Sequence, residues 1–147
     1  MARYSAVIQS VSDPASTFGY LSRFDRAVEW DPGVAEAEML TSEPIARGSR
    51  FRLVARFVGR SVPLEYEVVE FRAPERLVLH AETGLINSTD TITFEPDGSG
   101  TVVTYDAVLD GKGLARLADP LLALAFRRIG DRAVAGLRAR LSQSVSR

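Results

Sequence analysis

The hydrophobic pattern of this chain changes its period abruptly near residue 112. From residue 34 to about residue 109, apolar residues alternate with polar ones, which indicates strands that each bury one face. Beyond Gly111-Lys112-Gly113 the apolar residues recur at helical spacing as far as Leu141, which predicts one long amphipathic helix. Such a helix must pack its apolar face onto the sheet, so the order of elements predicts an α+β layer architecture.

Turn signals divide the alternating region into six strands. In the clearest strand, Phe51, Leu53 and Phe57 alternate with arginines, so one face is buried and the other is exposed to solvent. Short turns such as Gly48-Ser49 and the segment 97–100 join neighbouring strands, as an antiparallel meander requires. The predicted strands are 34–42, 49–58, 62–72, 76–82, 85–95 and 100–109.

The start of the chain predicts one more strand and two short helices. Residues 2–11 alternate loosely and carry β-branched residues, which favours a strand. Asp13 can then cap a helix whose first residue is Pro14. Two short helices, over 14–21 and 23–30, would therefore separate the first strand from the other six.

The C-terminal helix is predicted from Pro120 to Leu141. At 1.5 Å per residue it would be roughly 33 Å long, which is enough to cross the whole sheet. Pro120 either begins its main segment or kinks it. The apolar residues form two adjoining stripes, one with Leu114, Leu117, Leu121 and Leu124, the other with Leu122, Phe126, Ile129, Ala133, Leu137 and Leu141.

These elements predict a single domain, residues 1–147, built on a seven-stranded curved antiparallel sheet. Its first strand would pair with its last, and the sheet would wrap around the C-terminal helix. A strongly twisted sheet cannot touch a straight helix along its whole width. We therefore expect a cavity in the gap between the helix and the sheet.

The composition excludes several classes of protein. With 18 basic and 19 acidic residues the net charge is -1, so no overall field attracts nucleic acid. The absence of cysteine excludes disulfides and thiolate metal sites, and we expect neither a metal nor a cofactor. No stretch reaches the ~20 apolar residues of a membrane span, so we expect no membrane insertion and a cytoplasmic location. Lys112 is the only lysine among many arginines, a bias that favours a bacterial source.

Several segments, in this order and spacing, resemble the SRPBCC or START-like superfamily, and within it the polyketide cyclase/dehydrase and lipid transport group. The resemblance covers nearly the whole chain and rests on Val11-Ser12-Asp13-Pro14, Glu29-Trp30-Asp31-Pro32-Gly33-Val34, Pro74-Glu75-Arg76-Leu77, 90–96, 100–105 and the leucine-rich helix with Pro120. It implies the helix-grip fold and a cavity that holds hydrophobic ligands such as lipids, sterols or polyketides. It also implies that a minority of members cyclise or dehydrate polyketides, but it brings no universal catalytic motif.

Strand alternation and helical spacing select ten candidate ligand-binding residues. They are Trp30, Phe51, Leu53, Phe57, Tyr66, Leu79, Asp90, Tyr105, Phe126 and Ile129. The two tyrosines lie on the same strand faces as apolar residues, so their rings should point toward the cavity. Each phenol then either donates a hydrogen bond to a ligand or bonds to nearby backbone. Asp90 either enters the cavity with a raised pKa or sits near a strand end or pairs with an arginine. Trp30 either gates the cavity rim or plugs the end of the core.

His80, the only histidine, is predicted to lie outside the cavity. Leu77, Leu79 and Ala81 form the apolar face of its strand, and side chains alternate between the two faces of a strand. His80 therefore belongs to the opposite face, where it is either exposed or paired with a residue of a neighbouring strand.

The first hypothesis for function is a non-enzymatic or weakly catalytic carrier that binds a hydrophobic small molecule, lipid or polyketide-like. The alternative is a polyketide aromatase/cyclase or dehydratase that uses Tyr66, Tyr105 and Asp90. A third class, an interaction module, would need an exposed apolar patch, which the alternation does not show. The expected partner is a hydrophobic ligand, not nucleic acid, and the expected state is a monomer or weak homodimer.

Overall fold

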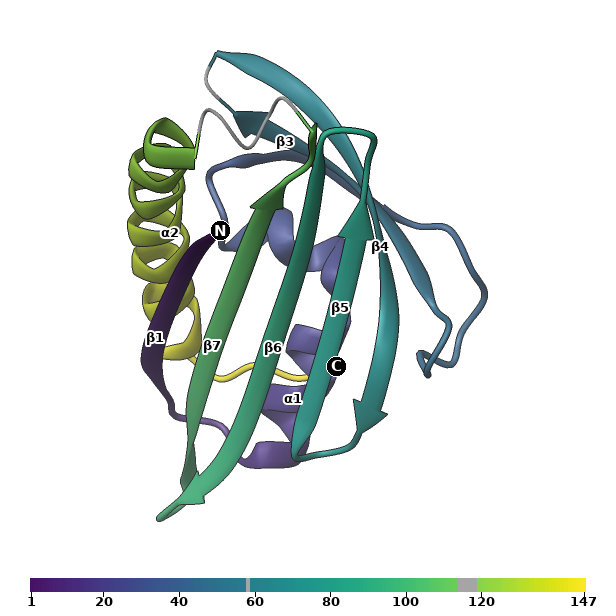
Figure 1. The fold of residues 1–147 in the computed structure, drawn as a ribbon. Helices are drawn as coiled ribbons and strands as arrows, with labels where there is room; N and C mark the ends of the chain where they lie inside the picture. The colour runs from purple at the N-terminus through teal and green to yellow at the C-terminus, as the bar shows by residue number, and fades with distance from the viewer. Residues whose placement is uncertain (58, 114–118) are drawn as a thin grey trace.

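The computed structural model describes residues 1–57, 59–113 and 119–147 (Figure 1). Its strands are β1 (Ala2–Ser10), β2 (Val34–Met39), β3 (Arg50–Phe57), β4 (Arg60–Arg72), β5 (Arg76–Glu82), β6 (Ile86–Asp97) and β7 (Gly100–Gly111). Its helices are α1 (Pro14–Ser22), the short 3-10 helix η1 (Phe24–Glu29) and α2 (Asp119–Leu141). The predicted strand end at residue 58, Leu114, Leu117 and the side chain of Leu122 lie outside the described residues.

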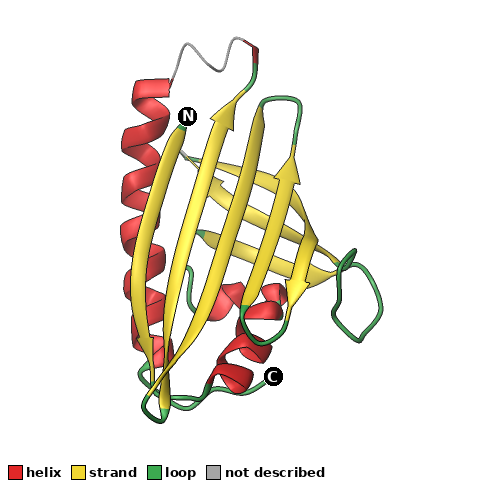
Figure 2. Ribbon diagram, turned by 60° about the horizontal axis from the view of Figure 1, so that its bottom comes forward, coloured by secondary structure: helices red, strands yellow, loops and turns green. Residues whose placement is uncertain are grey.

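The seven strands form one antiparallel sheet in the order β1-β7-β6-β5-β4-β3-β2. The first strand pairs with the last, with Ala2 opposite Leu109 and Ser10 opposite Thr101, which confirms the prediction. Figures 1 and 2 show that the sheet curls, with α2 along β1 and with α1 and η1 on its inner side. This is the helix-grip arrangement, with the two short helices between β1 and β2.

Local signals account for most of the element bounds. Asp13 caps α1 by accepting a hydrogen bond from the backbone N–H of Ser16 at 3.3 Å. β2 ends at Met39, earlier than the predicted residue 42, because the chain then turns and the Thr41 hydroxyl accepts from the backbone N–H of Arg50 at 3.1 Å. The β6–β7 hairpin is longer than predicted, since pairing continues to its turn.

The C-terminal half of α2 lies tightly against the rest of the molecule. A Cβ atom at Gly136 would lie 1.8 Å from the backbone carbonyl oxygen of Trp30, so only glycine fits there. Leu137 and Leu141 are almost completely buried, at 1% and 0% exposure. Beyond them, the backbone N–H of Val11 donates to the carbonyl oxygen of Leu141 at 3.0 Å. These contacts fix the end of α2 to β1 and to the segment after η1.

The N-terminal half of α2 is packed much less closely. The helix begins at Asp119, so Pro120 belongs to its first turn and begins the segment without kinking it. Leu121 and Leu124 are 72% and 53% exposed, so for these two residues of the first stripe the expectation that the apolar face packs onto the sheet is wrong. Among the described side chains of α2, those of Ile129 and Leu137 do line the cavity beneath the helix. Within the described residues, no helix combines the length and apolar character needed to cross a bilayer.

Replacing Gly136 by alanine should destabilise the protein although alanine is the better helix former. Helix propensity alone would stabilise the variant by about 1 kcal/mol. The clash with the Trp30 carbonyl should instead lower the free energy of unfolding by about 2 kcal/mol, a typical cost of overpacking. Urea denaturation measures the difference. Gly84→Ala, where an added Cβ meets nothing within 4 Å, is the control, and a stabilised Gly136→Ala would contradict the packing described here.

Candidate functional site

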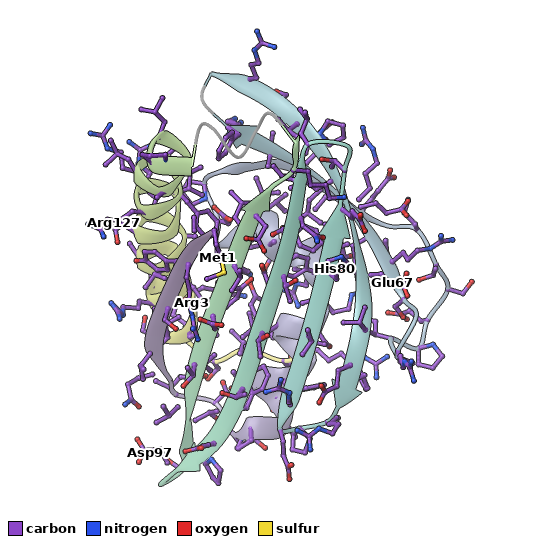
Figure 3. All side chains as sticks on the ribbon, viewed as in Figure 1. Met1, Arg3, Glu67, His80, Asp97 and Arg127 are labelled. Carbon is purple, nitrogen blue, oxygen red and sulfur yellow. The ribbon has the colours of Figure 1, made fainter. Side chains whose placement is uncertain are left out.

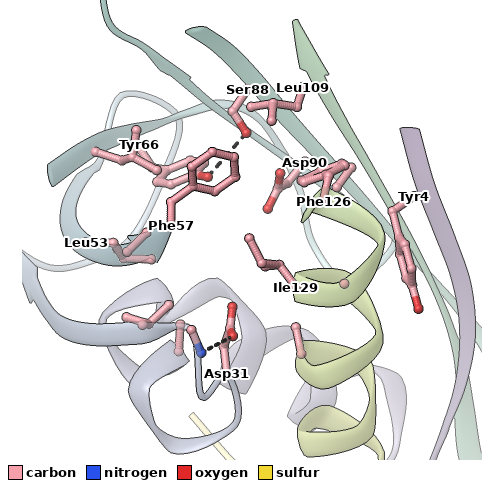
Figure 4. Close-up of a pocket in the computed structure, with 18 of the residues that line it drawn as sticks. Tyr4, Asp31, Leu53, Phe57, Tyr66, Ser88, Asp90, Leu109, Phe126 and Ile129 are labelled. Atoms are coloured by element: carbon pink, nitrogen blue, oxygen red, sulfur yellow. Dashed lines mark hydrogen bonds between the residues drawn. The ribbon is translucent and has the colours of Figure 1, made fainter. Parts of the chain in front are cut away.

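A cavity of about 340 Å³ lies between α2, the inner face of the sheet and the segment that links η1 to β2 (Figure 4). Its volume is within the range of small-molecule pockets and far above the space needed by one water molecule. Most of its walls are apolar: α2 contributes Phe126, Ile129, Ala133, Val134 and Leu137, and the strands contribute further aliphatic and aromatic residues. The α2 residues that line it run from Phe126 to Leu137, so the cavity lies beside the middle and the C-terminal half of the helix.

The structure brings eight of the ten candidate residues together around this cavity. They are Trp30, Leu53, Phe57, Tyr66, Asp90, Tyr105, Phe126 and Ile129. Phe51 and Leu79 do not line it, since both side chains are fully buried in the core. The ring of Phe24 on η1 packs against Phe51 at a centroid distance of 6.4 Å, so this part of the inner face is already covered. That any of these residues contacts a ligand stays a prediction.

The cavity also contains a carboxylate that the sequence pattern did not point to. Asp31 follows η1 and is not among the ten candidate residues, yet it lines the cavity. Its Oδ1 atom accepts a hydrogen bond from the backbone N–H of Gly33 at 2.8 Å. Burial raises the pKa of this carboxyl, and the Gly33 N–H opposes the increase. The Asp-Pro-Gly sequence at residues 31–33 indicates a turn, but the alternation of side chains along a strand does not predict the direction of a side chain in a loop.

Asp90 enters the cavity from β6 and bonds to Tyr105 on the neighbouring strand β7. The Tyr105 hydroxyl donates to Asp90 Oδ2 at 2.6 Å, and Asp90 is only 7% exposed. Burial raises the pKa of Asp90 to about 6; the Tyr105 hydrogen bond opposes this increase, and the charge of Asp31 adds to it. Among the ion pairs of the described residues none involves Asp90, so the alternative of an arginine partner is not what the structure shows.

The two candidate tyrosines, Tyr66 and Tyr105, bond to side chains and not to backbone. The hydroxyl groups of Tyr66 and Ser88 lie 3.3 Å apart, and either can be the donor. Burial raises the pKa of both Tyr66 and Tyr105, and the negative charge of Asp90 raises both further. Both phenols therefore remain protonated at neutral pH, when they can donate hydrogen bonds but do not carry charge.

Trp30 and His80 take structural positions. The Trp30 ring is 6% exposed and meets the Tyr105 ring edge-on, with centroids 6.2 Å apart, so it forms part of the cavity wall at the end of the core. His80 lies on the outer face of the sheet (Figure 3). Its Nδ1 atom is 3.0 Å from the Thr89 hydroxyl on the paired strand. The predicted cross-strand position of the histidine is confirmed.

This arrangement combines an apolar cavity with one polar region. A carboxyl with a pKa near 6 can exchange a proton near neutral pH, and the neighbouring phenol holds it in place. The same groups can equally form hydrogen bonds to a bound molecule without any reaction. The apolar walls would bury the remainder of that molecule.

Comparisons with known proteins place these observations in a family. Residues 1–142 match the family described as "Polyketide cyclase / dehydrase and lipid transport". No curated protein matches the sequence.

Among solved structures, a START superfamily protein from Mycobacterium smegmatis is similar, with a TM-score of 0.77 at 15% identity, over 96% of this chain and 97% of that one. Ginseng major latex-like protein 151 from Panax ginseng gives 0.70 at 13% identity, over 95% and 97%. The di-domain ARO/CYC BexL from the BE-7585A biosynthetic pathway gives 0.68 at 16% identity, over 96% of this chain and 50% of that one. At these identities the likeness establishes the fold alone.

Replacing Asp90 by asparagine should remove a pH-dependent cost from the folded state. The pKa of Asp90 rises from 3.8 to about 6 on folding, so the folded protein binds more protons between these values and loses stability as the pH rises through them. Because a pKa change of one corresponds to about 1.4 kcal/mol, the full cost well above pH 6 is on the order of 3 kcal/mol, of which a small part is already present at pH 4. The difference in unfolding free energy between Asp90→Asn and wild type should therefore shift by about 2 kcal/mol in favour of asparagine between pH 4 and pH 7.5. Urea denaturation at the two pH values measures this shift, and a difference that does not change with pH would contradict the buried carboxyl.

Proposed function

The chain belongs to the family described as "Polyketide cyclase / dehydrase and lipid transport", and we propose that it binds a hydrophobic small molecule, lipid or polyketide-like, in the cavity beneath α2. The observation that carries the proposal is the cavity itself, about 340 Å³ in volume with mainly apolar walls. A packed core closes such spaces, because an unfilled cavity costs stability. A ligand of matching shape would fill it.

Burial of apolar surface supplies the affinity in this proposal. Each 100 Å² of ligand surface removed from water contributes about 2.5 kcal/mol, from which the entropy lost on association must be subtracted. Leu53, Phe126 and Ile129 provide apolar contact surface on the sheet and the helix. The hydroxyl groups of Ser88 and Tyr66 and the carboxyl of Asp90 give the ligand a polar end and so set its orientation.

A second candidate function, aromatase/cyclase or dehydratase action on a polyketide chain, is favoured by one specific observation. Asp90, with a pKa of about 6, is hydrogen-bonded to Tyr105 inside the cavity. As a carboxylate it can accept a proton from carbon next to a ketone, while a phenol donates to the ketone oxygen. Turnover of a poly-β-ketone thioester, lost in Asp90→Asn and Tyr105→Phe, would support catalysis. Binding without turnover would leave the carrier function.

Several finer expectations accompany the proposal. A cytoplasmic location, a bacterial source, a monomer or weak homodimer and the absence of nucleic acid as a partner stay predictions from the sequence.

Filling the cavity should abolish ligand binding without unfolding the protein. Ala107 lies on β7 in the cavity wall, and Ala107→Phe would place a ring in the space that the ligand needs. The neutral fluorescent probe N-phenyl-1-naphthylamine should bind the wild type saturably, and its affinity for Ala107→Phe should fall at least about tenfold, the equivalent of about 1.4 kcal/mol. Val69→Phe adds the same ring at a position that is 40% exposed and does not line the cavity, and it is the matched control. Equal affinity for wild type and Ala107→Phe would show that the cavity is not the binding site.

A further inference from the structure

The charged groups of the cavity are unbalanced. Two carboxyl groups line it, Asp31 from the segment after η1 and Asp90 from β6. Among the described lining residues, Arg56 is the only basic one. Its guanidinium is committed to the backbone carbonyl of Pro32 at 2.9 Å, and its side chain is exposed to solvent. The described walls therefore place no buried cation against either acid.

The two cavity carboxyl groups also have fewer hydrogen-bond donors than acceptor oxygens. Asp90 Oδ2 accepts from Tyr105, and Asp31 Oδ1 accepts from the Gly33 backbone. Within the described part of the chain, no group donates to Asp90 Oδ1 or Asp31 Oδ2. Asp90 is only 7% exposed, and Figure 4 shows its carboxyl directed into the cavity. Two acceptor oxygens thus lack a donor among the described residues, in a largely apolar space.

We propose that the cavity selects apolar molecules that carry a protonated amine, whose ammonium group donates to Asp90 and is attracted by the charge of Asp31, and that it rejects apolar molecules that carry a carboxylate. The proposal rests on the binding function proposed above and specifies the ligand for the same cavity. An ammonium group has three donors and one positive charge, so it can donate to the free oxygen of Asp90 and offset part of the negative charge of the two acids. A carboxylate would add a further negative charge and no donor.

The electrostatics of the acids agree with this selection. The charge of Asp31 contributes to the raised pKa of Asp90, so the two carboxyl groups lie within electrostatic range of each other. Tyr66 and Tyr105 stay protonated and contribute no charge. An alcohol of the same shape brings one donor and no charge, so we expect it to bind with intermediate affinity.

Three naphthalene probes that differ only in their polar end test the proposal on the wild-type protein. They are 2-(2-naphthyl)ethylamine, 2-(2-naphthyl)ethanol and the carboxylate anion of 2-naphthylacetic acid. Their affinities are measured by isothermal titration calorimetry at pH 8, where Asp90 is ionised. We expect the amine to bind about tenfold more tightly than the alcohol, and the carboxylate to bind more weakly than both, since hydrogen bonds to charged groups are the stronger ones. An alcohol or carboxylate that binds as tightly as the amine overturns the amine selection and leaves the hydrophobic-ligand proposal standing. Failure of all three probes to bind overturns both proposals.

Three isosteric variants test which carboxyl groups are responsible. Asp90→Asn and Asp31→Asn should each lower the affinity for the amine roughly tenfold and leave the affinity for the alcohol within about twofold. Asp97→Asn, at the exposed tip of the β6–β7 hairpin (Figure 3), removes the same charge far along the sheet and should change neither affinity. An equal loss of amine affinity in Asp97→Asn would contradict a local contact. If a cavity variant does not fold, the order of the three wild-type affinities still decides the question.

Discussion

The close approach of the C-terminal half of α2 to the backbone of Trp30 is the constraint from which the rest of this structure follows. Gly136 permits that approach because no Cβ atom stands between the helix and the Trp30 carbonyl. Leu137 and Leu141 then fill the core below. A strongly curled sheet cannot touch a helix along its whole width, so a gap remains between the two. The cavity is the space between this sheet and the stretch of α2 from Phe126 to Leu137.

Two acids in this apolar space give the cavity its chemical character. Burying a carboxyl costs free energy unless a partner compensates for it. Tyr105 compensates in part for Asp90 and the Gly33 backbone in part for Asp31. The residual cost appears as raised pKa values for both acids. Folding alone gains nothing from that arrangement, whereas a bound molecule with hydrogen-bond donors would recover the lost interactions. Both functions considered above depend on this same property of the site.

Sequence periodicity predicted the layers of the fold and the inner face of the sheet, because burial of one face imposes a period of two on strands and of 3.6 on a helix. Tyr66, Asp90 and Tyr105 were found in this way. Periodicity does not report how deep a position lies, so Phe51 and Leu79 share the parity of the cavity residues but belong to the packed core. It also could not find Asp31, whose direction is set by a loop, or the exposure of Leu121 and Leu124, which depends on where the helix leaves the sheet.

A crystal of the purified protein pressurised with xenon tests the central claim most directly, since xenon enters apolar cavities and scatters anomalously. The account predicts a xenon peak enclosed by Leu53, Phe126 and Ile129, with the backbone of α2 still in contact with Trp30 at Gly136. Side chains that fill this space and leave no xenon site, or an α2 helix detached from Trp30, would contradict it.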